Sequence, residues 1–572
     1  MDRPTPSPRA VDPDIVLRYC DLALKLDQSD RAQAVLEKAT QRLDHWSSPQ
    51  LLRLMQVAEK NRDFKLAAAA FAQATTRDTV LLPLAIYAVK LAHTAADADL
   101  LARVRRWLES HLPENEIARF RLQSDLLLDG PDVALARARA ARVKMRAPNE
   151  AADLVEVLFQ AGKRKTVLRY LSFCRRRWPN SFRFLALLTT AYQRFGAPQQ
   201  ALDLLAASAD PLSARVLRMR LHILLESNRL EEADALIAQA GDIGAALLNP
   251  FQMMRLKLGR GQIDAADALA RVVSTGMGRG GGANSKFRAT HIGALLNEAQ
   301  LFLRSNDGLA PDMSEALERV FFHPAKLALD RWQNTLSTDA PPDSAPDIPR
   351  RILQYWDTAT IPPEVAAVMQ SWQDLPGYTY HRYDKAAAIA FLKDRFDADH
   401  VRAFRMANNV AEECDFLRLC LLLADGGIYT DADDMLVGDL DALRTLGRGM
   451  VLFREPVIGS IANNLMMARA GHPLLQIAVD MARSSLLARE NDNTWAKTGP
   501  GLISRATAAY IAQTPADEVP QNLCLLPGYV ASTQIQAHVR LPYKATPAYW
   551  NSNDGATPPE LSKVLHTIAA TA

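Results

Sequence analysis

The sequence predicts a multidomain protein in which an all-α array of helical hairpins precedes an α/β domain. Apolar residues recur at helical spacing from residue 14 to about 275, and turn residues recur there at a nearly fixed interval. From Ile348 onward, short strand-like runs alternate with helical segments. A chain of 572 residues is long enough for roughly two to four domains of this kind.

The spacing of the turn residues defines the N-terminal array. Successive markers lie 32 to 34 residues apart, and they are Ser29, Asn61, Ala95, Asp129, Gly162, Gly196, Asn228 and Gly261. Alanines follow five positions after several markers, where a small side chain lets paired helices pack closely: Ala34, Ala134, Ala201, Ala233 and Ala266. This period resembles that of tetratricopeptide repeats, which is about 34 residues. We expect a tetratricopeptide-like α-solenoid over residues 14–275. A protein or peptide partner on its concave face and a spacer role without a ligand are equally open.

Composition shifts mark the remaining boundaries. Residues 1–13 lack the apolar core of a signal peptide and are expected to be a disordered lead. Residues 276–336 begin with a glycine-dense hinge and continue as connecting helices, and residues 337–347 form a linker rich in Pro, Asp and Ser. The second domain is therefore predicted over residues 348–572.

The overall balance of residue types narrows the function. The formal net charge is +3 and no basic run is interleaved with aromatic residues, so we expect no nucleic-acid partner. No apolar stretch approaches the ~18 residues of a transmembrane segment. Five scattered cysteines without a CxxC pair favour a reduced, cytoplasmic protein, and a peripheral position at a membrane stays open.

One segment of the second domain combines several chemical signals. A predicted helix carries Asp415 and Arg418 on one face, and Gly426 with Gly427 would end it in a left-handed conformation. Residues 428–430 then form a very short strand that delivers Asp431 and Asp433. The Asp-x-Asp spacing occurs at four other places in the chain, so this context is what distinguishes the pair. Carboxylates in this arrangement can share a divalent cation with a diphosphate.

The order of several segments resembles the DXD-containing "sugar-binding region" glycosyltransferases, which include the fungal initiating α-1,6-mannosyltransferase and, more distantly, the clostridial glucosylating toxins. The matching segments are 348–356, Asp415-x-x-Arg418, 426–433, 463–474 and 498–501. The resemblance spans about 200 residues, from roughly 350 to 552. It implies a GT-A (Rossmann-like) fold, a nucleotide-sugar donor, a divalent metal (Mn or Mg) and retention of anomeric configuration.

The resemblance also assigns expected roles to individual residues. Trp356 would stack on the donor base, Asp415 and Arg418 would grip the donor sugar, and Tyr429 would line the donor site. Asp431 and Asp433 would hold the ribose and the metal. Asn464 and Trp550 are added to the donor-binding residues, and Asn551 or Ser552 to the metal ligands. Asp415, Arg418 and Asp433 are the expected catalytic residues.

The chain departs from the family pattern at a few positions. Leu353 stands where His often precedes the Gln, and Asp357 follows the Trp where Gly is usual. Asp434 adds a third carboxylate, which leaves the register of the metal ligands ambiguous by one residue. The terminal segment around Trp550 lacks the family's His and its final Trp.

The sequence therefore predicts a metal-dependent retaining glycosyltransferase. It would move a sugar from a UDP- or GDP-sugar to a saccharide, lipid or protein acceptor, in polysaccharide or glycoconjugate synthesis. The alternative is a non-catalytic solenoid interaction protein whose C-terminal domain binds a nucleotide sugar without turnover. A glycoside hydrolase is disfavoured, because it needs two carboxylates flanking a sugar at set separations.

Overall fold

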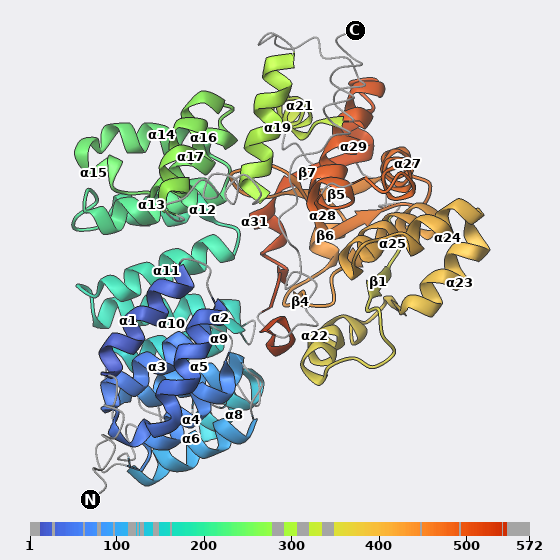
Figure 1. Cartoon of the computed structure of the whole chain (residues 1–572). Helices are drawn as coiled ribbons and strands as arrows, with labels where there is room; N and C mark the ends of the chain where they lie inside the picture. The colour runs from blue at the N-terminus through green and yellow to red at the C-terminus, as the bar shows by residue number, and fades with distance from the viewer. Residues whose placement is uncertain are drawn as a thin grey trace, which may run out of the picture. The chain divides into compact units, whose positions relative to one another are not determined.

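The computed structural model describes residues 12–25, 29–60, 63–76, 82–94, 98–111, 122, 125, 131–140, 148–160, 163–276, 291–305, 320–333, 348–446, 449–490, 493–539 and 541–545. The chain divides into two units (Figure 1). The first holds residues 1–179 and 541–549, and the second holds residues 180–540 and 550–572. The predicted boundaries at residues 275 and 347 both fall within the second unit. The predicted linker 337–347 and residues 1–11 of the predicted lead 1–13 lie outside the described residues, whereas Pro13 of that lead begins the first helix.

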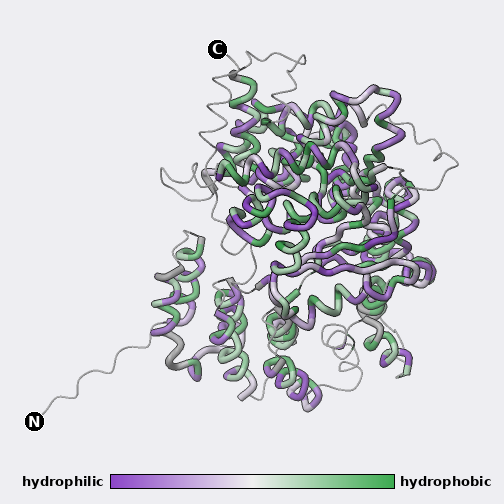
Figure 2. The backbone as a smooth tube through the Cα atoms, turned by 90° about the vertical axis from the view of Figure 1, so that its right-hand side faces the viewer, coloured by the Kyte–Doolittle hydropathy of each residue, from purple (hydrophilic) through white to green (hydrophobic). Residues whose placement is uncertain are grey.

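The described part of the first unit is helical. Purple and green alternate along its helices in Figure 2, as expected for helices with one buried and one exposed face. Leu54, Phe71 and Leu100 lie in its apolar core. Its helices are α1 (Pro13–Lys25), α2 (Ser29–Ala39), η1 (Thr40–His45), α3 (Ser48–Lys60), α4 (Phe64–Ala74), α5 (Leu82–Thr94), α6 (Ala98–His111), α8 (Pro131–Ala140), α9 (Pro148–Gln160), α10 (Arg164–Arg177) and η2 (Pro542–Ala545).

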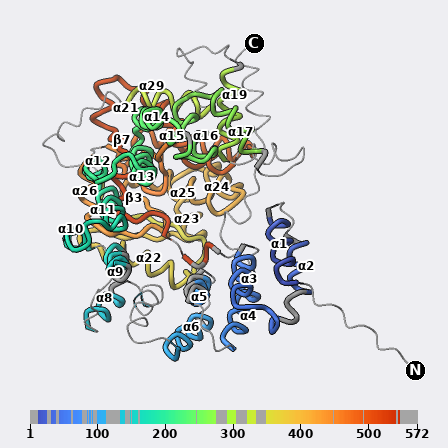
Figure 3. The backbone as a smooth tube through the Cα atoms, turned by 90° about the vertical axis from the view of Figure 1, so that its left-hand side faces the viewer, coloured from blue at the N-terminus to red at the C-terminus, as the bar shows by residue number. Residues whose placement is uncertain are grey.

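The second unit begins with further helices that pack in consecutive pairs (Figure 3). They are α11 (Phe182–Arg194), α12 (Pro198–Ala206), α13 (Ala214–Glu226), α14 (Leu230–Gln239), α15 (Gly241–Ala245), α16 (Pro250–Gly259), α17 (Ile263–Gly276), α19 (His291–Ser305) and α21 (Phe322–Gln333). The pairs are α11 with α12, α13 with α14, and α16 with α17. The mostly helical N-terminal region is therefore confirmed, while the finer tetratricopeptide-like description stays a prediction.

Three of the predicted turn markers lie between paired helices, and four of the five alanines spaced from the markers are buried as expected. Gly196, Asn228 and Gly261 each connect the two helices of a pair, and their φ angles are 79°, 55° and 71°. Left-handed φ angles of this kind favour Gly and Asn. Ala134, Ala201, Ala233 and Ala266 are all fully buried. Ala34 is exposed, so the packing role expected for it is wrong, and Ala32 is the fully buried alanine of that helix.

A mixed sheet follows the helices. Its strands are β1 (Arg351–Tyr355), β2 (Thr379–Tyr383), β3 (Gly427–Thr430), β5 (Met450–Arg454), β6 (Ile461–Ala468) and β7 (Leu523–Pro527), in the spatial order β2-β1-β3-β6-β5-β7. β6 runs antiparallel to both of its neighbours, and the other pairings are parallel. A separate antiparallel pair joins β4 (Met435–Leu436) to β8 (Ile535–Gln536).

Alternate residues of the strands face two different cores. Leu353 and Tyr429 pack into a core shared with the helices on one face, whereas their neighbours Ile352 and Ile428 pack into a second core with Trp372. The helices of this region are α22 (Pro363–Gln373), α23 (Lys385–Arg395), α24 (Ala398–Arg405), α25 (Val410–Asp425), α26 (Asp441–Arg444), α27 (Pro473–Leu487), α28 (Thr494–Lys497), α29 (Pro500–Gln513), α30 (Val519–Asn522) and α31 (Gly528–Ala531). Successive side chains of a strand point to opposite faces of the sheet, so each buried strand contributes side chains to both cores. No described helix is long and apolar enough to span a membrane.

Helix α25 is fixed at both ends. The Asn409 side chain accepts the N–H of Glu412 and caps its first turn. Gly426 ends it with φ 65° and ψ 179°. The predicted glycine stop is confirmed, but its conformation is the extended, glycine-only region rather than the left-handed helical one. A Cβ on Gly426 would lie 2.6 Å from the backbone nitrogen of Ala470, and one on Gly427 would lie 2.6 Å from the carbonyl oxygen of Arg351. Close backbone approach therefore requires both glycines.

The turns of the helical pairs contact the sheet region within the second unit. The Asn228 amide donates to the carbonyl of Glu455 at 3.0 Å, and its oxygen accepts the N–H of Val457 at 2.6 Å. A Cβ on Gly196 would lie 2.5 Å from Cγ2 of Thr533. Residues 455–460, which connect β5 to β6, are thus held by Asn228, one of the turn positions that mark the repeat in the sequence.

Candidate active site

The site lies where the strand order of the sheet reverses. β1 pairs with β2 on one side and with β3 on the other, so the carboxyl ends of β1 and β3 lie next to each other. In open α/β sheets, ligands bind at this kind of position. Trp356 follows β1 and Asp431 follows β3. The topology therefore brings the predicted base-stacking residue and the predicted carboxylates to one edge.

Arg418 is the centre of the site. Its Nη2 lies 3.1 Å from Oδ1 of Asp415 and 3.0 Å from Oδ1 of Asp431. Its Nη1 donates to the carbonyl oxygen of Asn463, and its guanidinium carbon lies 4.5 Å from the ring centroid of Tyr429. Because Tyr429 and Asp431 are two residues apart, both point to the face of the sheet that α25 covers. The predicted Asp415–Arg418 helix pair is thus present, and it includes Asp431.

Asp415 is held by groups from three parts of the chain. Its two carboxylate oxygens accept Nδ2 of Asn463 and Oγ1 of Thr498, each at 2.9 Å, and one of them also contacts Arg418. Burial raises the pKa of this carboxyl to about 6, although Arg418 and Thr498 oppose the rise. The contacts with Asn463, Thr498 and Arg418 give the Asp415 side chain a fixed orientation. A group that grips a sugar requires such an orientation.

Asp431, Asp433 and His538 form a group that fits a divalent cation. One ligand atom from each lies within 4.8 Å of the others. Burial raises the pKa of Asp431, and the neighbouring carboxylate of Asp433 adds to the rise while Arg418 opposes it. A cation placed among these groups would relieve that repulsion. Two carboxylate oxygens and an imidazole nitrogen are ligands that Mn²⁺ and similar divalent ions accept.

Asp434 has a structural role and does not belong to the group that fits a cation. Its side chain is fully buried and accepts Nδ2 of Asn464 at 2.6 Å and the backbone N–H of His538 at 2.7 Å. Burial, together with Asp431 and Asp433, raises its pKa well above the usual range of a carboxyl group. These bonds fix the turn that carries His538 against the end of β3.

The other predicted residues lie around this cluster. Tyr429 is fully buried, and its hydroxyl contacts Sγ of Cys414 at 2.8 Å. The carbonyl of Asn464 accepts the N–H of Asp431 at 3.0 Å. Trp356 is half-buried, and its indole N–H donates to Oγ1 of Thr358 at 3.1 Å. Burial of the ring raises the pKa of the Tyr429 hydroxyl well above its usual value.

The terminal candidates Trp550, Asn551 and Ser552 lie outside the described residues. Sequence reasoning missed three contributors: His538, Asn463 and Thr498. His538 follows the two-residue strand β8, and no motif around it indicated a ligand. Asn463 and Thr498 stood within the segments that carried the family resemblance, but neither had been assigned a role.

Comparison with known proteins confirms the resemblance. Residues 362–448 match the family described as "Glycosyltransferase sugar-binding region containing DXD motif". The enzyme class that this match defines is glycosyltransferase. A stretch of 133 residues, 22% of this chain, is 29% identical to the initiation-specific alpha-1,6-mannosyltransferase of Saccharomyces cerevisiae. A second stretch of 178 residues, 30% of this chain, is 24% identical to an uncharacterized glycosyltransferase of Acanthamoeba polyphaga mimivirus.

These matches are partial. The chain spans 28% of the length of the yeast relative and 69% of the viral one. Among solved structures, the PaToxG glycosyltransferase aligns with 43% of this chain and 94% of its own length, with 16% identity and a TM-score of 0.25. A Rap protein complexed with competence and sporulation factor aligns with 56% of this chain and 91% of its own, with 13% identity and a TM-score of 0.25. Both structural likenesses are too weak to define a fold.

Proposed function

We propose that this protein is a metal-dependent, retaining glycosyltransferase of the GT-A type that uses a UDP- or GDP-sugar as donor. The observation that supports this most strongly is the bridge that Arg418 makes between Asp415 and Asp431, beside Asp433 and His538 at the end of β3. The sheet supports a GT-A assignment, because the cluster lies at its topological switch point, next to the single antiparallel strand of its six. The acceptor is a saccharide, lipid or protein hydroxyl.

The transfer exchanges one bond at the anomeric carbon for another. The bond from that carbon to the nucleoside diphosphate breaks, the bond to the acceptor oxygen forms, and the acceptor hydroxyl loses its proton. Asp431, Asp433 and His538 would hold the divalent cation, which when bound neutralises charge on the leaving diphosphate. Arg418 is a fixed, desolvated cation at the same place and adds electrostatic stabilisation with little reorganisation.

The remaining residues position the donor. Asp415 is locked by Asn463 and Thr498 and presents its carboxylate beside the sugar-binding end of the site. Trp356, at the end of β1, would stack on the base. Tyr429 supports Arg418 from beneath through its ring. Together these contacts hold the donor in one orientation, and orientation supplies a large part of the rate enhancement in enzymes.

Release of free nucleoside diphosphate from UDP- and GDP-sugars in the presence of Mn²⁺ tests the proposal. The full-length protein should release it, and Asp433→Asn should abolish release. Asp399→Asn is the matched control, because Asp399 belongs to another Asp-x-Asp pair and is exposed on α24. Donor binding without release for every donor tried would refute catalysis and favour a non-catalytic nucleotide-sugar binder.

A further inference from the structure

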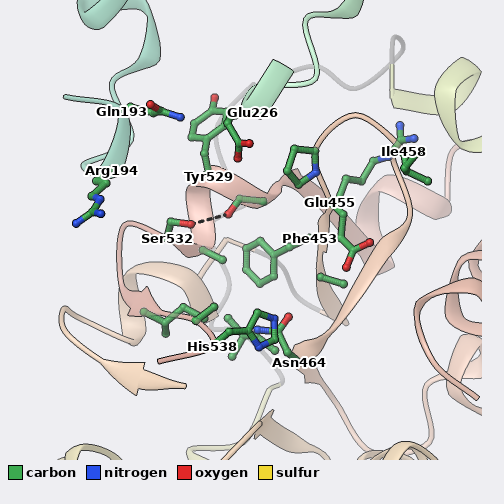
Figure 4. Close-up of a pocket in the computed structure, with 18 of the residues that line it drawn as sticks. Gln193, Arg194, Glu226, Phe453, Glu455, Ile458, Asn464, Tyr529, Ser532 and His538 are labelled. Atoms are coloured by element: carbon green, nitrogen blue, oxygen red, sulfur yellow. Dashed lines mark hydrogen bonds between the residues drawn. The ribbon is translucent and has the colours of Figure 1, made fainter. Parts of the chain in front are cut away.

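A large cavity adjoins the carboxylate cluster within the second unit. Its volume is about 750 Å³, which falls inside the ~300–1,000 Å³ range of small-molecule sites. One wall comes from the helical pairs and includes Gln193 of α11, Glu226 of α13 and Arg255 of α16. The other wall comes from the sheet region. Figure 4 shows Gln193 and Glu226 at one side of the cavity, with Asn464 and His538 at the other.

The cavity is continuous with the proposed donor site. Asn464 and His538 both line it. Asn464 is bonded to Asp431 through its carbonyl and to Asp434 through its amide, and His538 belongs to the group that fits a cation. A ligand in the cavity would therefore lie next to the group that is proposed to hold the donor.

The helical wall presents polar groups that have reason to bind a ligand. The guanidinium of Arg255 lines the cavity and offers N–H donors, with a fixed positive charge, to the oxygen atoms of a ligand. Glu226 and the amide of Gln193 add acceptors and a further donor on the same wall.

The opposite wall is equally mixed in chemistry. Glu455 lines the cavity, and its side chain accepts the hydroxyl of Ser460. Tyr529 contributes an aromatic ring with a hydroxyl. Apolar side chains such as Phe453 and Trp495 lie between these polar groups around the cavity. Charged groups, an amide and aromatic rings together suit a saccharide, because its hydroxyl groups need hydrogen-bond partners and its ring faces pack on apolar surface.

We propose that this cavity binds a saccharide acceptor and that α11, α13 and α16 form its specificity-determining wall. The inference rests on the proposed function and deepens it. A hydroxyl of the acceptor saccharide becomes the glycosidic oxygen. Its bond to the anomeric carbon forms, the bond from that carbon to the diphosphate breaks, the leaving diphosphate takes the bonding electron pair, and the hydroxyl proton passes to that diphosphate. The helical pairs are thus part of the active site.

Steady-state transfer tests this with the full-length protein, Mn²⁺, the donor that turns over, and neutral tri- and tetrasaccharides as probes. Arg255→Gln and Glu226→Gln should each raise the KM for the saccharide by about 10-fold or more, the loss expected for a hydrogen bond to a charged group. The KM for the donor should change less. Arg218→Gln on α13 is the matched control, since Arg218 is exposed and does not line the cavity, and it should change neither KM.

The outcomes separate this inference from the proposed function. An unchanged saccharide KM in both variants, equal changes in both KM values, or transfer only to peptides would overturn the saccharide wall while leaving the glycosyltransferase intact. If no donor turns over, saturation-transfer NMR with the same saccharides decides the matter. Saccharide contact that is lost in Arg255→Gln and kept in Arg218→Gln supports the cavity. Absence of saccharide contact in the wild-type protein refutes it.

Discussion

Asn228 holds the backbone of Val457, a residue 229 positions later in the chain. Its side-chain oxygen accepts the N–H of Val457 at 2.6 Å, while its amide donates to the carbonyl of Glu455 at 3.0 Å. Both Asn228 and Val457 have left-handed φ angles, of 55° and 70°. The turn of one helical pair therefore fixes the connection between β5 and β6 in a conformation that non-glycine residues rarely adopt.

Replacing Asn228 should weaken this connection. Asn228→Gly keeps the left-handed backbone accessible but removes both hydrogen bonds, so we expect a loss of about 1–3 kcal/mol in the free energy of unfolding. Urea denaturation of the full-length protein measures it. Asn249→Gly is the control: Asn249 only caps α16, and its replacement by Gly should cost a few tenths of a kcal/mol. Equal losses in the two variants would contradict the docking role.

Gly426 and Gly471 share a positive φ angle but differ in how closely other backbone atoms approach them. Both have φ 65°, but a Cβ on Gly426 would meet backbone 2.6 Å away, whereas nothing lies within 4 Å of one on Gly471. Gly471→Ala should therefore cost only the conformational term, about 1–2 kcal/mol. Gly426→Ala should cost clearly more and should also lower donor turnover, because it displaces the start of β3. Thermal denaturation and nucleoside diphosphate release check both, and equal melting temperatures would refute the crowding.

Arg418 should be required for both folding and turnover. Arg418→Met leaves the buried Asp415 and the half-buried Asp431 without a countercharge, and removing one partner of a buried pair costs about 3–5 kcal/mol. Arg395→Met is the control, since Arg395 pairs with Asp425 at the surface and such pairs contribute about 1 kcal/mol or less. Chemical denaturation distinguishes the two. A stable Arg418→Met variant with normal donor release would remove Arg418 from the site.

Divalent cations should stabilise the protein through Asp433 and His538. A ligand at 100 times its Kd adds about 2.7 kcal/mol to the stability of the folded state, so Mn²⁺ should raise the Tm. Chelation with EDTA should reverse the rise. Asp433→Asn and His538→Ala should each reduce it, whereas Asp399→Asn should preserve it. A Tm that is independent of Mn²⁺ in the wild-type protein would exclude this metal site.

His472 should make the protein sensitive to acid. It is fully buried, its Nδ1 accepts the N–H of Leu474, and its Nε2–H donates to the carbonyl of Asn522. Burial lowers its pKa from 6.5 to about 4. Above pH 6.5 the ring is neutral in both states. Between pH 6.5 and 4 only the unfolded state takes up the proton, so stability falls as the pH falls, by up to about 3 kcal/mol in total.

The slope of unfolding free energy against pH measures this effect. His472→Asn keeps a side chain that can cap α27, and it should flatten the slope between pH 6.5 and 4 by up to one proton. His291 and His323 also have pKa values lowered to about 4 by burial, so a residual slope should remain. Parallel curves for wild-type and variant proteins would show that His472 titrates normally.

Local sequence patterns predicted much of the site. Asp415 and Arg418 are three residues apart on a helix, Gly426 ends that helix, and the short strand that follows leads into Asp431, so their relation follows from chain geometry within 20 residues. The alternation of strands and helices that was predicted from Ile348 onward is present in the structure in the same way. The repeat spacing located the turns at Gly196, Asn228 and Gly261 without any knowledge of what they contact.

Contacts across long sequence separations could not be predicted. His538 reaches Asp433 from more than 100 residues away through a turn that Asp434 holds. Asp434, the extra carboxylate that left the register of the metal ligands ambiguous in the sequence, is the residue that anchors this turn. Likewise, nothing local to Asn228 indicates that it binds residues 455 and 457. Such pairings depend on how the helical pairs pack on the sheet, which periodicity alone does not encode.

The packing of Ile458 limits how the chain can be cut. Ile458 is 5% exposed, and its neighbours in the core include Met254, Leu258 and Ile292 from the helical pairs. A fragment that starts at the predicted linker, near Ile348, would strip this apolar cover from the β5–β6 connection and remove one wall of the cavity. A fragment that starts at Asn180 keeps both. For expression and crystallisation, the piece of this protein that keeps the sheet and its helical cover together is therefore about three-quarters longer than the predicted sheet domain suggests.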